Sequence, residues 1–403
     1  MVRMSPGLLR AWTLLAVATG LCATGAQQTN RLLAEVPIQT EFGGLAFFPG
    51  SVNSIPLEFL LDTGGGGSSL APNVANQLGV KLQPGRSSVA GNPALEVGVV
   101  PSATITVGSA VHKAENLMVA PLDPLEPIFG RRIDGILGGD WMQQYVVELD
   151  FETSRMRLYD PKDFKYTGGG QPLPLAVVRG IPFVDLNVTL PNGKSFWGHF
   201  LVDSGGGGMA VHIYSSVVAR NGLAAGLKVI AETSQGIGGA TARFALRGAE
   251  IELGKYHLKK PVVVVAPDQA GLRADPTSSG LVGMDVLQRF KITFDYSRGR
   301  MYLEPNRRLH DPFVYDTTGM GLRAAPPDFS TFTVSRVKDA SPAKEAGLQA
   351  GDQLLQIDGR DLAGMRLEAA RIILQRAGKT HRLKISRAGQ TMEVALHTRE
   401  TLP

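Results

Sequence analysis

The chain contains an internal duplication, which limits its possible folds more than any other feature. Residues 59–64 align without a gap with residues 200–205, and residues 135–142 with residues 280–287. A run of four glycines follows the aspartate of each first segment, at residues 64–67 and 205–208. Two copies are too few for a solenoid, which needs about three or more repeats. The sequence therefore predicts two homologous lobes.

Both lobes are rich in strand-like segments. Alternating or continuous apolar patterns with many β-branched residues predict strands at residues 36–48, 103–107, 146–159, 181–190, 244–253 and 262–266. Short helices are expected at residues 72–78 and 215–221. A stretch rich in Gly and Pro at residues 167–174 predicts a linker between the lobes, and a second boundary is expected at residues 306–311.

From about residue 314 the pattern changes and predicts a small α+β domain. Strands are expected at residues 332–337, 353–357, 382–387 and 391–397, with helices at residues 342–346 and 367–375. About 85 residues are enough for a small hydrophobic core.

The first 26 residues have the pattern of a signal peptide. Arg3 and Arg10 supply a positive start before an apolar run at residues 11–23, and Thr24-Gly25-Ala26 is a small-residue cleavage site. We expect an exported protein, periplasmic or secreted. An uncleaved anchor or a lipoprotein is the alternative, although Leu21 before the single cysteine, Cys22, fits a lipoprotein signal poorly.

Composition argues against several classes of function. The 41 Lys and Arg residues are mixed with 36 Asp and Glu residues, so a net charge of +5 forms no basic block of the kind that binds nucleic acid. The seven histidines show no zinc-ligand spacing. Cleavage of the signal peptide would remove the only cysteine, and with it disulfides and a cysteine nucleophile. We expect no nucleic acid, no metal and no cofactor.

Two short aspartate motifs carry the candidate chemistry. Asp62-Thr63-Gly64 and Asp203-Ser204-Gly205 each follow an apolar run, and an apolar pair with glycine follows them at residues 136–138 and 281–283. One Asp-Thr-Gly alone is typical of a turn. Two copies in the same order at the ends of buried strands indicate a site.

These motifs resemble those of retropepsin-like aspartic peptidases, here with both lobes on one chain, over roughly residues 36–305. The resemblance implies a mainly β, duplicated acid-protease barrel fold. It also implies that Asp62 and Asp203 share a catalytic water, while Thr63 and Ser204 interlock the loops and the N–H groups of Gly64 and Gly205 stabilise the charged pair.

The residue types suit such a reaction. Two carboxylates ~3 Å apart cannot both ionise, so they share one proton. The ionised partner takes a proton from the attacking water, and the protonated partner donates to the developing oxyanion. Because the pair titrates together, either aspartate could be the base.

A glycine-rich segment in the second lobe, Gly236-Ile237-Gly238-Gly239, resembles the flap tip of a retroviral protease. A flap that closes over substrate would exclude water and add backbone hydrogen bonds. The alternative is an ordinary glycine hairpin. The equivalent stretch of the first lobe, residues 87–93, is less clear.

The sequence departs from the family at one place. The family usually has Ser, Thr or Ala after the Asp-Thr/Ser-Gly motif, and here Gly65 and Gly206 stand there. A missing hydroxyl changes the environment of the outer carboxylate oxygen, and glycine makes the loops costly to order. A weak or inactive peptidase is therefore the alternative.

The C-terminal domain resembles a PDZ domain. The loop Gly319-Met320-Gly321-Leu322 would offer N–H groups to a peptide's terminal carboxylate before an expected strand, and Leu367, Arg371 and Leu374 would lie on the groove helix. For these three the alternative is an ordinary helix face, with Leu374 partly in the core. The segment also fits a dinucleotide-binding pattern, but Pro326 and Pro327 prevent the helix that pattern needs.

The sequence thus predicts four segments: a signal peptide (1–26), two aspartic peptidase lobes (27–166 and 167–308) and a PDZ domain (309–403). The expected function is an exported aspartic endopeptidase that cleaves polypeptides, with a PDZ domain that binds C-terminal peptides or recruits substrate. The alternative is an inactive peptidase-like body whose PDZ domain is the working part. A duplicated chain completes its own site, so activity should not require a dimer.

Overall fold

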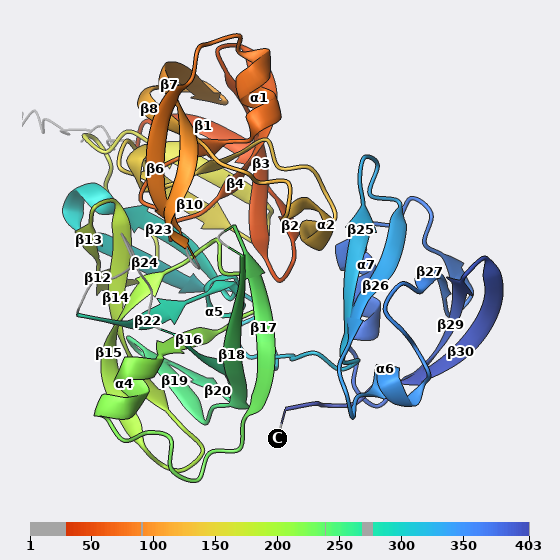
Figure 1. Cartoon of the computed structure of the whole chain (residues 1–403). Coiled ribbons are helices and arrows are strands. Elements are labelled where there is room, and N and C mark those ends of the chain that lie inside the picture. Colours follow the sequence, from red (N-terminus) through yellow and green to blue (C-terminus); the bar gives the residue numbers. More distant parts are fainter. Residues whose placement is uncertain (1–29, 90–91, 238, 268–276, 403) are drawn as a thin grey trace, which may run out of the picture.

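The computed structural model describes residues 30–89, 92–237, 239–267 and 277–402, and it confirms the mainly β architecture (Figure 1). The expected signal peptide lies outside the described residues. Among the described helices, none combines the length and the apolar character needed to cross a membrane.

The first lobe is built on one curved sheet. Its strands follow one another in the order β2 (Gln39–Glu41), β3 (Leu45–Val52), β4 (Ile55–Leu61), β9 (Gly135–Leu137), β5 (Ser69–Leu70), β8 (Ala110–Val119), β7 (Asn92–Val107) and β6 (Gln83–Val89). Since β3 also pairs with β7, the sheet bends back on itself. The short helices of this lobe are α1 (Pro72–Gln77), α2 (Glu126–Phe129) and α3 (Gly139–Met142).

The second lobe repeats this topology. Its sheet runs β17 (Ile230–Gly236), β18 (Gly239–Arg247), β21 (Val262–Ala266), β16 (Val211–Tyr214), β22 (Ser278–Val282), β15 (Ser195–Val202), β14 (Ile181–Thr189), β19 (Glu250–Leu253) and β20 (Tyr256–Lys259), with β13 (Ala176–Val178) beside β14. Strand β15 lies parallel to β22 as β4 lies parallel to β9. Helices α4 (Ser215–Arg220) and α5 (Met284–Leu287) correspond to α1 and α3, so the duplication in the sequence is a duplication of structure.

A third sheet joins the lobes. Its order is β1 (Leu32–Pro37), β11 (Arg155–Tyr159), β10 (Val146–Asp150), β23 (Phe290–Asp295), β24 (Arg300–Pro305) and β12 (Gln171–Pro174). The lobes meet where β10 pairs with β23, and the 3₁₀ turn η2 (Tyr296–Arg298) links β23 to β24. The linker expected at residues 167–174 is therefore partly wrong, because its second half is β12. An edge strand tolerates Pro172 and Pro174, since proline cannot donate to a second neighbour.

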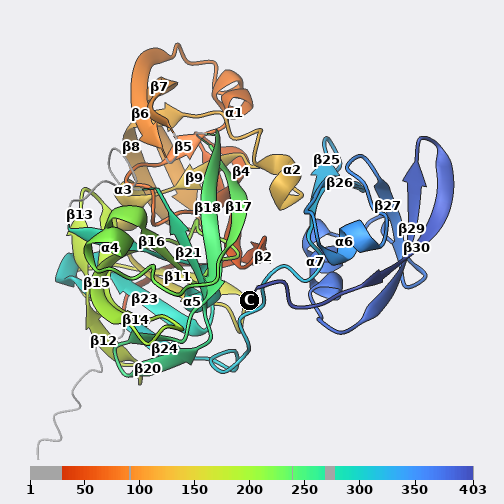
Figure 2. The same cartoon turned by 60° about the horizontal axis from the view of Figure 1, so that its bottom comes forward.

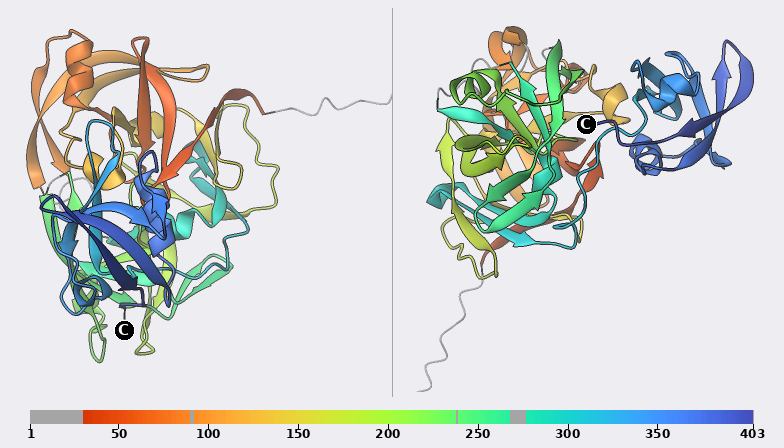
Figure 3. Two further views of the ribbon diagram at one scale, coloured as in Figure 1. Left: turned by 90° about the vertical axis from the view of Figure 1, so that its right-hand side faces the viewer. Right: turned by 90° about the horizontal axis from the view of Figure 1, so that it is seen from below.

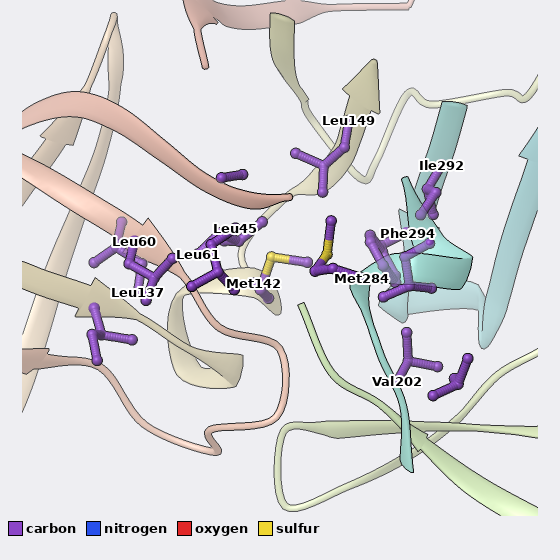
Figure 4. Close-up of a cluster of buried hydrophobic side chains, with 14 of the residues drawn as sticks. Leu45, Leu60, Leu61, Leu137, Met142, Leu149, Val202, Met284, Ile292 and Phe294 are labelled. Carbon is purple, nitrogen blue, oxygen red and sulfur yellow. The ribbon is translucent and has the colours of Figure 1, made fainter. Parts of the chain in front are cut away.

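Apolar side chains from both lobes pack together between these sheets. Figure 4 shows Met142, at the end of α3, close to Met284, which begins α5. Side chains of β10 and β23 continue the cluster, including Leu149, Ile292 and Phe294, all buried. Burial of one such side chain contributes about 1.5–3 kcal/mol. One hydrophobic core thus spans the two lobes and supports the loops between them.

The C-terminal domain has its own sheet and core. The sheet runs β25 (Met320–Ala325), β26 (Thr331–Val337), β27 (Gln353–Ile357), β29 (Thr380–Arg387) and β30 (Gln390–His397), with β28 (Arg360–Asp361) beside β27; α6 (Pro342–Glu345) and α7 (Leu367–Leu374) pack on it. Figure 3 shows this domain to one side of the lobes, and in Figures 1 and 2 α2 lies beside β25.

Candidate active site

The two motif aspartates stand directly after equivalent strands. Asp62 follows β4 and Asp203 follows β15, and each N–H donates to a carbonyl of the neighbouring strand, Leu137 (3.0 Å) and Val282 (2.9 Å). These acceptors belong to the apolar pairs that the sequence placed with the motifs. These hydrogen bonds fix the backbone of both aspartates at equivalent strand ends, where both residues line one cavity.

Glycine is required where the two loops meet. The N–H of Gly64 donates to Asp62 Oδ1 (2.9 Å), and the N–H of Gly205 donates to Asp203 Oδ1 (3.0 Å). A methyl group on Gly205 would lie only 2.5 Å from Cγ of Asp62. The second loop therefore packs its backbone against the carboxyl group of the first, an approach that a side chain would prevent.

Thr63 and Ser204 bind the loops to each other. The Thr63 hydroxyl donates to the carbonyl of Val202 (2.6 Å), and the Ser204 hydroxyl donates to that of Leu61 (2.9 Å). Each hydroxyl also accepts the N–H of the other residue. Both residues are buried, so this closed network holds the bases of the loops in one geometry.

The glycines after the apolar pairs support the loops from behind. A methyl on Gly138 would lie 2.6 Å from the carbonyl oxygen of Gly67, and one on Gly283 would lie 2.6 Å from that of Gly206. The next residues, Gly139 and Met284, donate N–H groups to Gly65 (2.8 Å) and Gly206 (2.9 Å). The long glycine runs are thus ordered by backbone hydrogen bonds.

The contacts that support the two aspartate loops differ between the lobes at one point. In the first lobe the Ser68 hydroxyl donates to Asp140 (2.6 Å), whereas the equivalent pair in the second lobe is Met209 and Asp285. Burial raises the pKa of Asp285 to about 7, partly opposed by Arg289 and reinforced by Glu368. Sequence reasoning missed this asymmetry, although the alignment at an offset of 141 residues shows Met209 in the place of Ser68.

A buried tyrosine near the first aspartate was also missed. Burial, together with the charge of Asp62, raises the pKa of Tyr296 well above its usual value. Its hydroxyl has no hydrogen-bond partner among the described residues. The first lobe has Phe151 at the corresponding position.

A cavity of about 1200 Å³ opens over the two loops, and both aspartates line it. The predicted flap is a hairpin in which Gly236 of β17 pairs with Gly239 of β18; Gly236, Ile237 and Gly239 line the cavity, and Gly238 lies outside the described residues. In the first lobe β6 and β7 form the corresponding hairpin, from which Ser87 reaches the cavity. The volume suits a peptide segment rather than a single small ligand.

The two departures from the family pattern have different surroundings. A methyl on Gly65 would meet Asp62 at ordinary contact distances, 3.6 Å from its carbonyl oxygen and 3.7 Å from Oδ2. A methyl on Gly206 would be tighter, 3.2 Å from the carbonyl oxygen and 3.3 Å from Cγ of Asp203. Neither glycine is forced by a positive φ.

The C-terminal residues partly depart from expectation. Gly319 has φ +75° and makes the turn, but Met320, Gly321 and Leu322 already belong to β25 instead of a preceding loop. Leu367 and Leu374 are buried in the domain core. Arg371 donates to the carbonyls of Leu322 (2.8 Å) and of Ile128 in α2 (2.7 Å), so the helix side of the groove touches the first lobe.

Comparison with known proteins agrees with this geometry. The family model for an aspartyl protease matches residues 48–141 and 186–286, one segment per lobe, and that for a PDZ domain matches residues 333–387. No curated protein matches. One solved structure with a match is a photosystem II D1 C-terminal processing protease, with 22% identity and a TM-score of 0.20. That match covers 22% of this chain and 24% of the other. The two lobes are therefore similar to an aspartyl protease, and the C-terminal domain is similar to a PDZ domain.

Proposed function

We propose that this protein is an aspartic endopeptidase in which Asp62 and Asp203 activate a water molecule. The observation that carries the proposal is the contact between the Gly205 backbone and the Asp62 carboxyl, held by the buried Thr63–Ser204 network. Such a rigid pair of carboxyl groups suits general acid–base attack of water on a carbonyl.

The substrate would be an extended polypeptide lying between the lobes. The hairpin of β17 and β18 would act as the flap, because its tip lines the same cavity as the two aspartates. Its exposed backbone groups could pair with a substrate strand. The PDZ domain would bind C-terminal peptides or recruit substrate. We further propose export through the N-terminal segment, and activity as a monomer, because one chain supplies both aspartates.

Cleavage of β-casein, an unstructured protein, between pH 3 and 8 tests the proposal. The chain from residue 27 should cut casein, and pepstatin, Asp62→Asn and Asp203→Asn should each abolish the cutting without unfolding the protein. A folded protein that cuts at no pH would support an inactive body instead. N-terminal sequencing of the exported protein tests cleavage after Ala26.

A further inference from the structure

The PDZ domain has an edge at which a peptide could add. Within the described residues, β25 pairs only with β26, and α7 lies along its other side. In PDZ domains a peptide binds by extending the sheet in such a groove. In this protein, however, part of the first lobe lies against the groove, and other residues of both groove walls border the cavity.

A segment of the first lobe, residues 125–131, covers the groove. Its helix α2 packs along β25, and the Arg371 guanidinium donates both to Ile128 of this segment and to Leu322 of β25. A methyl on Gly130 would come within 2.6 Å of Cβ of Leu367, the first residue of the groove helix. The segment thus contacts both walls of the groove, where a peptide would lie.

The groove helix α7 and the residue before it also contact a turn of the first lobe that lies beside the loop of Asp203. Glu368 accepts the N–H of Gly43 (3.2 Å), and Arg366 pairs with the buried carboxylate of Glu41 (2.7 Å). On its other side this turn abuts the loop of Asp203, because a methyl on Gly43 would overlap the backbone of Gly208. One turn therefore separates the groove helix from the second catalytic loop.

Residues in and just before the PDZ domain also bind strand β17 of the flap hairpin. Arg336 of β26 donates to the carbonyl of Thr233 in β17 (3.2 Å). Tyr315, which precedes the PDZ sheet, donates to Glu232 of the same strand (2.5 Å). With the PDZ domain docked, the flap strand is fixed at two successive residues.

We propose that residues 125–131 are an internal occupant of the PDZ groove, and that a C-terminal peptide displaces them and releases the flap. Peptide and segment compete for the same walls, so only undocked molecules bind peptide, and the apparent affinity is reduced in proportion to the undocked fraction. If 90% or more of the molecules are docked, abolishing docking should tighten peptide binding about tenfold or more. Release of the flap should then raise the rate of cleavage, and this second part rests on the proposed peptidase activity.

The sharpest test uses two glycines that both have a positive φ. Gly130→Ala places a methyl against Leu367, whereas Gly79, with φ +64°, has nothing within 4 Å of such a methyl. Gly130 has φ +73°, so both substitutions carry similar backbone strain and only the first should undock the PDZ domain. The radius of gyration, measured by small-angle X-ray scattering, should rise for Gly130→Ala alone.

Peptide binding is measured by fluorescence anisotropy. The probe is a pool of fluorescein-labelled octapeptides with a free C-terminal carboxylate and four random final residues. Gly130→Ala should bind this pool about tenfold more tightly than wild type or Gly79→Ala, and an amidated pool should show no such gain. Equal affinity for wild type and an undocked variant would overturn the proposal, as would failure of every variant to bind.

A second pair of variants guards against misfolding of Gly130→Ala. Arg366→Glu reverses a charge that pairs with Glu41, and Arg376→Glu makes the same change at an exposed residue just beyond α7. Only Arg366→Glu should undock the domain and tighten binding. If neither Gly130→Ala nor Arg366→Glu changes the radius of gyration, these contacts do not control docking and the proposal fails.

Casein cleavage separates this proposal from the proposed function. The free-carboxylate pool should raise kcat/KM of wild type severalfold and leave undocked Gly130→Ala, already faster, unchanged. If binding changes as expected but no variant cuts casein, the peptidase proposal fails while the internal occupant stands. If casein is cut at one rate whether or not the domain is docked, the control of the flap is wrong.

Discussion

Thr63 and Ser204 each accept the backbone N–H of the other residue, at 3.0 Å for the Ser204 hydroxyl and 2.9 Å for that of Thr63. The symmetry of this exchange means that neither lobe can shift against the other without breaking both bonds. The contact between the two aspartate loops therefore depends on the hydroxyl groups of the residues that follow the two aspartates.

Ser204→Ala should destabilise the protein. It leaves the N–H of Thr63 and the carbonyl of Leu61 without their partner in a buried site. We expect a loss of about 1–3 kcal/mol in the free energy of unfolding, measured with urea. Thr391→Ala, at an exposed position of β30, is the control and should change it by less than about 0.5 kcal/mol. Similar losses of unfolding free energy for the two variants would show that the Thr63–Ser204 network does not stabilise the fold.

Gly65→Ala and Gly206→Ala should differ. The methyl fits beside Asp62 at 3.6 Å but crowds Asp203 at 3.2 Å. Where the backbone is compatible, Ala in place of Gly stabilises by about 0.4–1 kcal/mol through the unfolded chain. Thermal unfolding should therefore show a higher Tm for Gly65→Ala and a lower gain or a loss for Gly206→Ala. The reverse order would show that the loops relax in a way that these distances do not capture.

Asp285 should make stability depend on pH. Its pKa rises from 3.8 in the unfolded chain to about 7 in the folded protein, chiefly through burial. Between these values the folded state binds the extra proton, so stability falls as the pH rises from about 4 to about 7. Asp285→Asn removes this fall and should be more stable than wild type at pH 8, by up to about 4 kcal/mol, but not at pH 4.

Urea unfolding at pH 4, 6 and 8 measures this difference. Asp339→Asn, which changes an almost fully exposed carboxylate, is the matched control and should follow wild type at each pH. A constant offset between Asp285→Asn and wild type across the range would show that Asp285 does not titrate there.

Tyr296→Phe should be neutral or stabilising. The hydroxyl is buried without a hydrogen-bond partner among the described residues, and the first lobe already has Phe151 at this position. Removal of an unsatisfied buried hydroxyl can recover about 1–3 kcal/mol. A clear loss of stability in urea would instead reveal a water molecule bound between this hydroxyl and its surroundings.

The two aspartate loops were predictable because the duplication aligns them residue by residue. The strand ends, the glycines and the hydroxyls all lie within short segments whose pattern is local. Strand boundaries were less accurate: the single strand expected at residues 36–48 is three, broken at Pro37–Gln39 and again at a turn where Phe42, Gly43 and Gly44 have positive φ. The two adjacent glycines were the signal for that turn.

The docking of the PDZ domain could not be predicted. Glu41 and Arg366 are 325 residues apart, and nothing local marks either as the partner of the other. The same holds for Arg371 and Ile128, because the acceptor is a backbone carbonyl that any residue would supply. Contacts of this kind depend on how two folded domains pack against each other, which local sequence patterns do not specify.

Fusion of the two lobes through the β10–β23 pairing has one more consequence. Two identical chains that met at such a sheet would have to carry the same residue behind both aspartates. In a single chain the two equivalent positions can carry different residues, and here they are Ser68 in the first lobe and Met209 in the second. Each half of the site can therefore be adjusted by mutation without altering its twin.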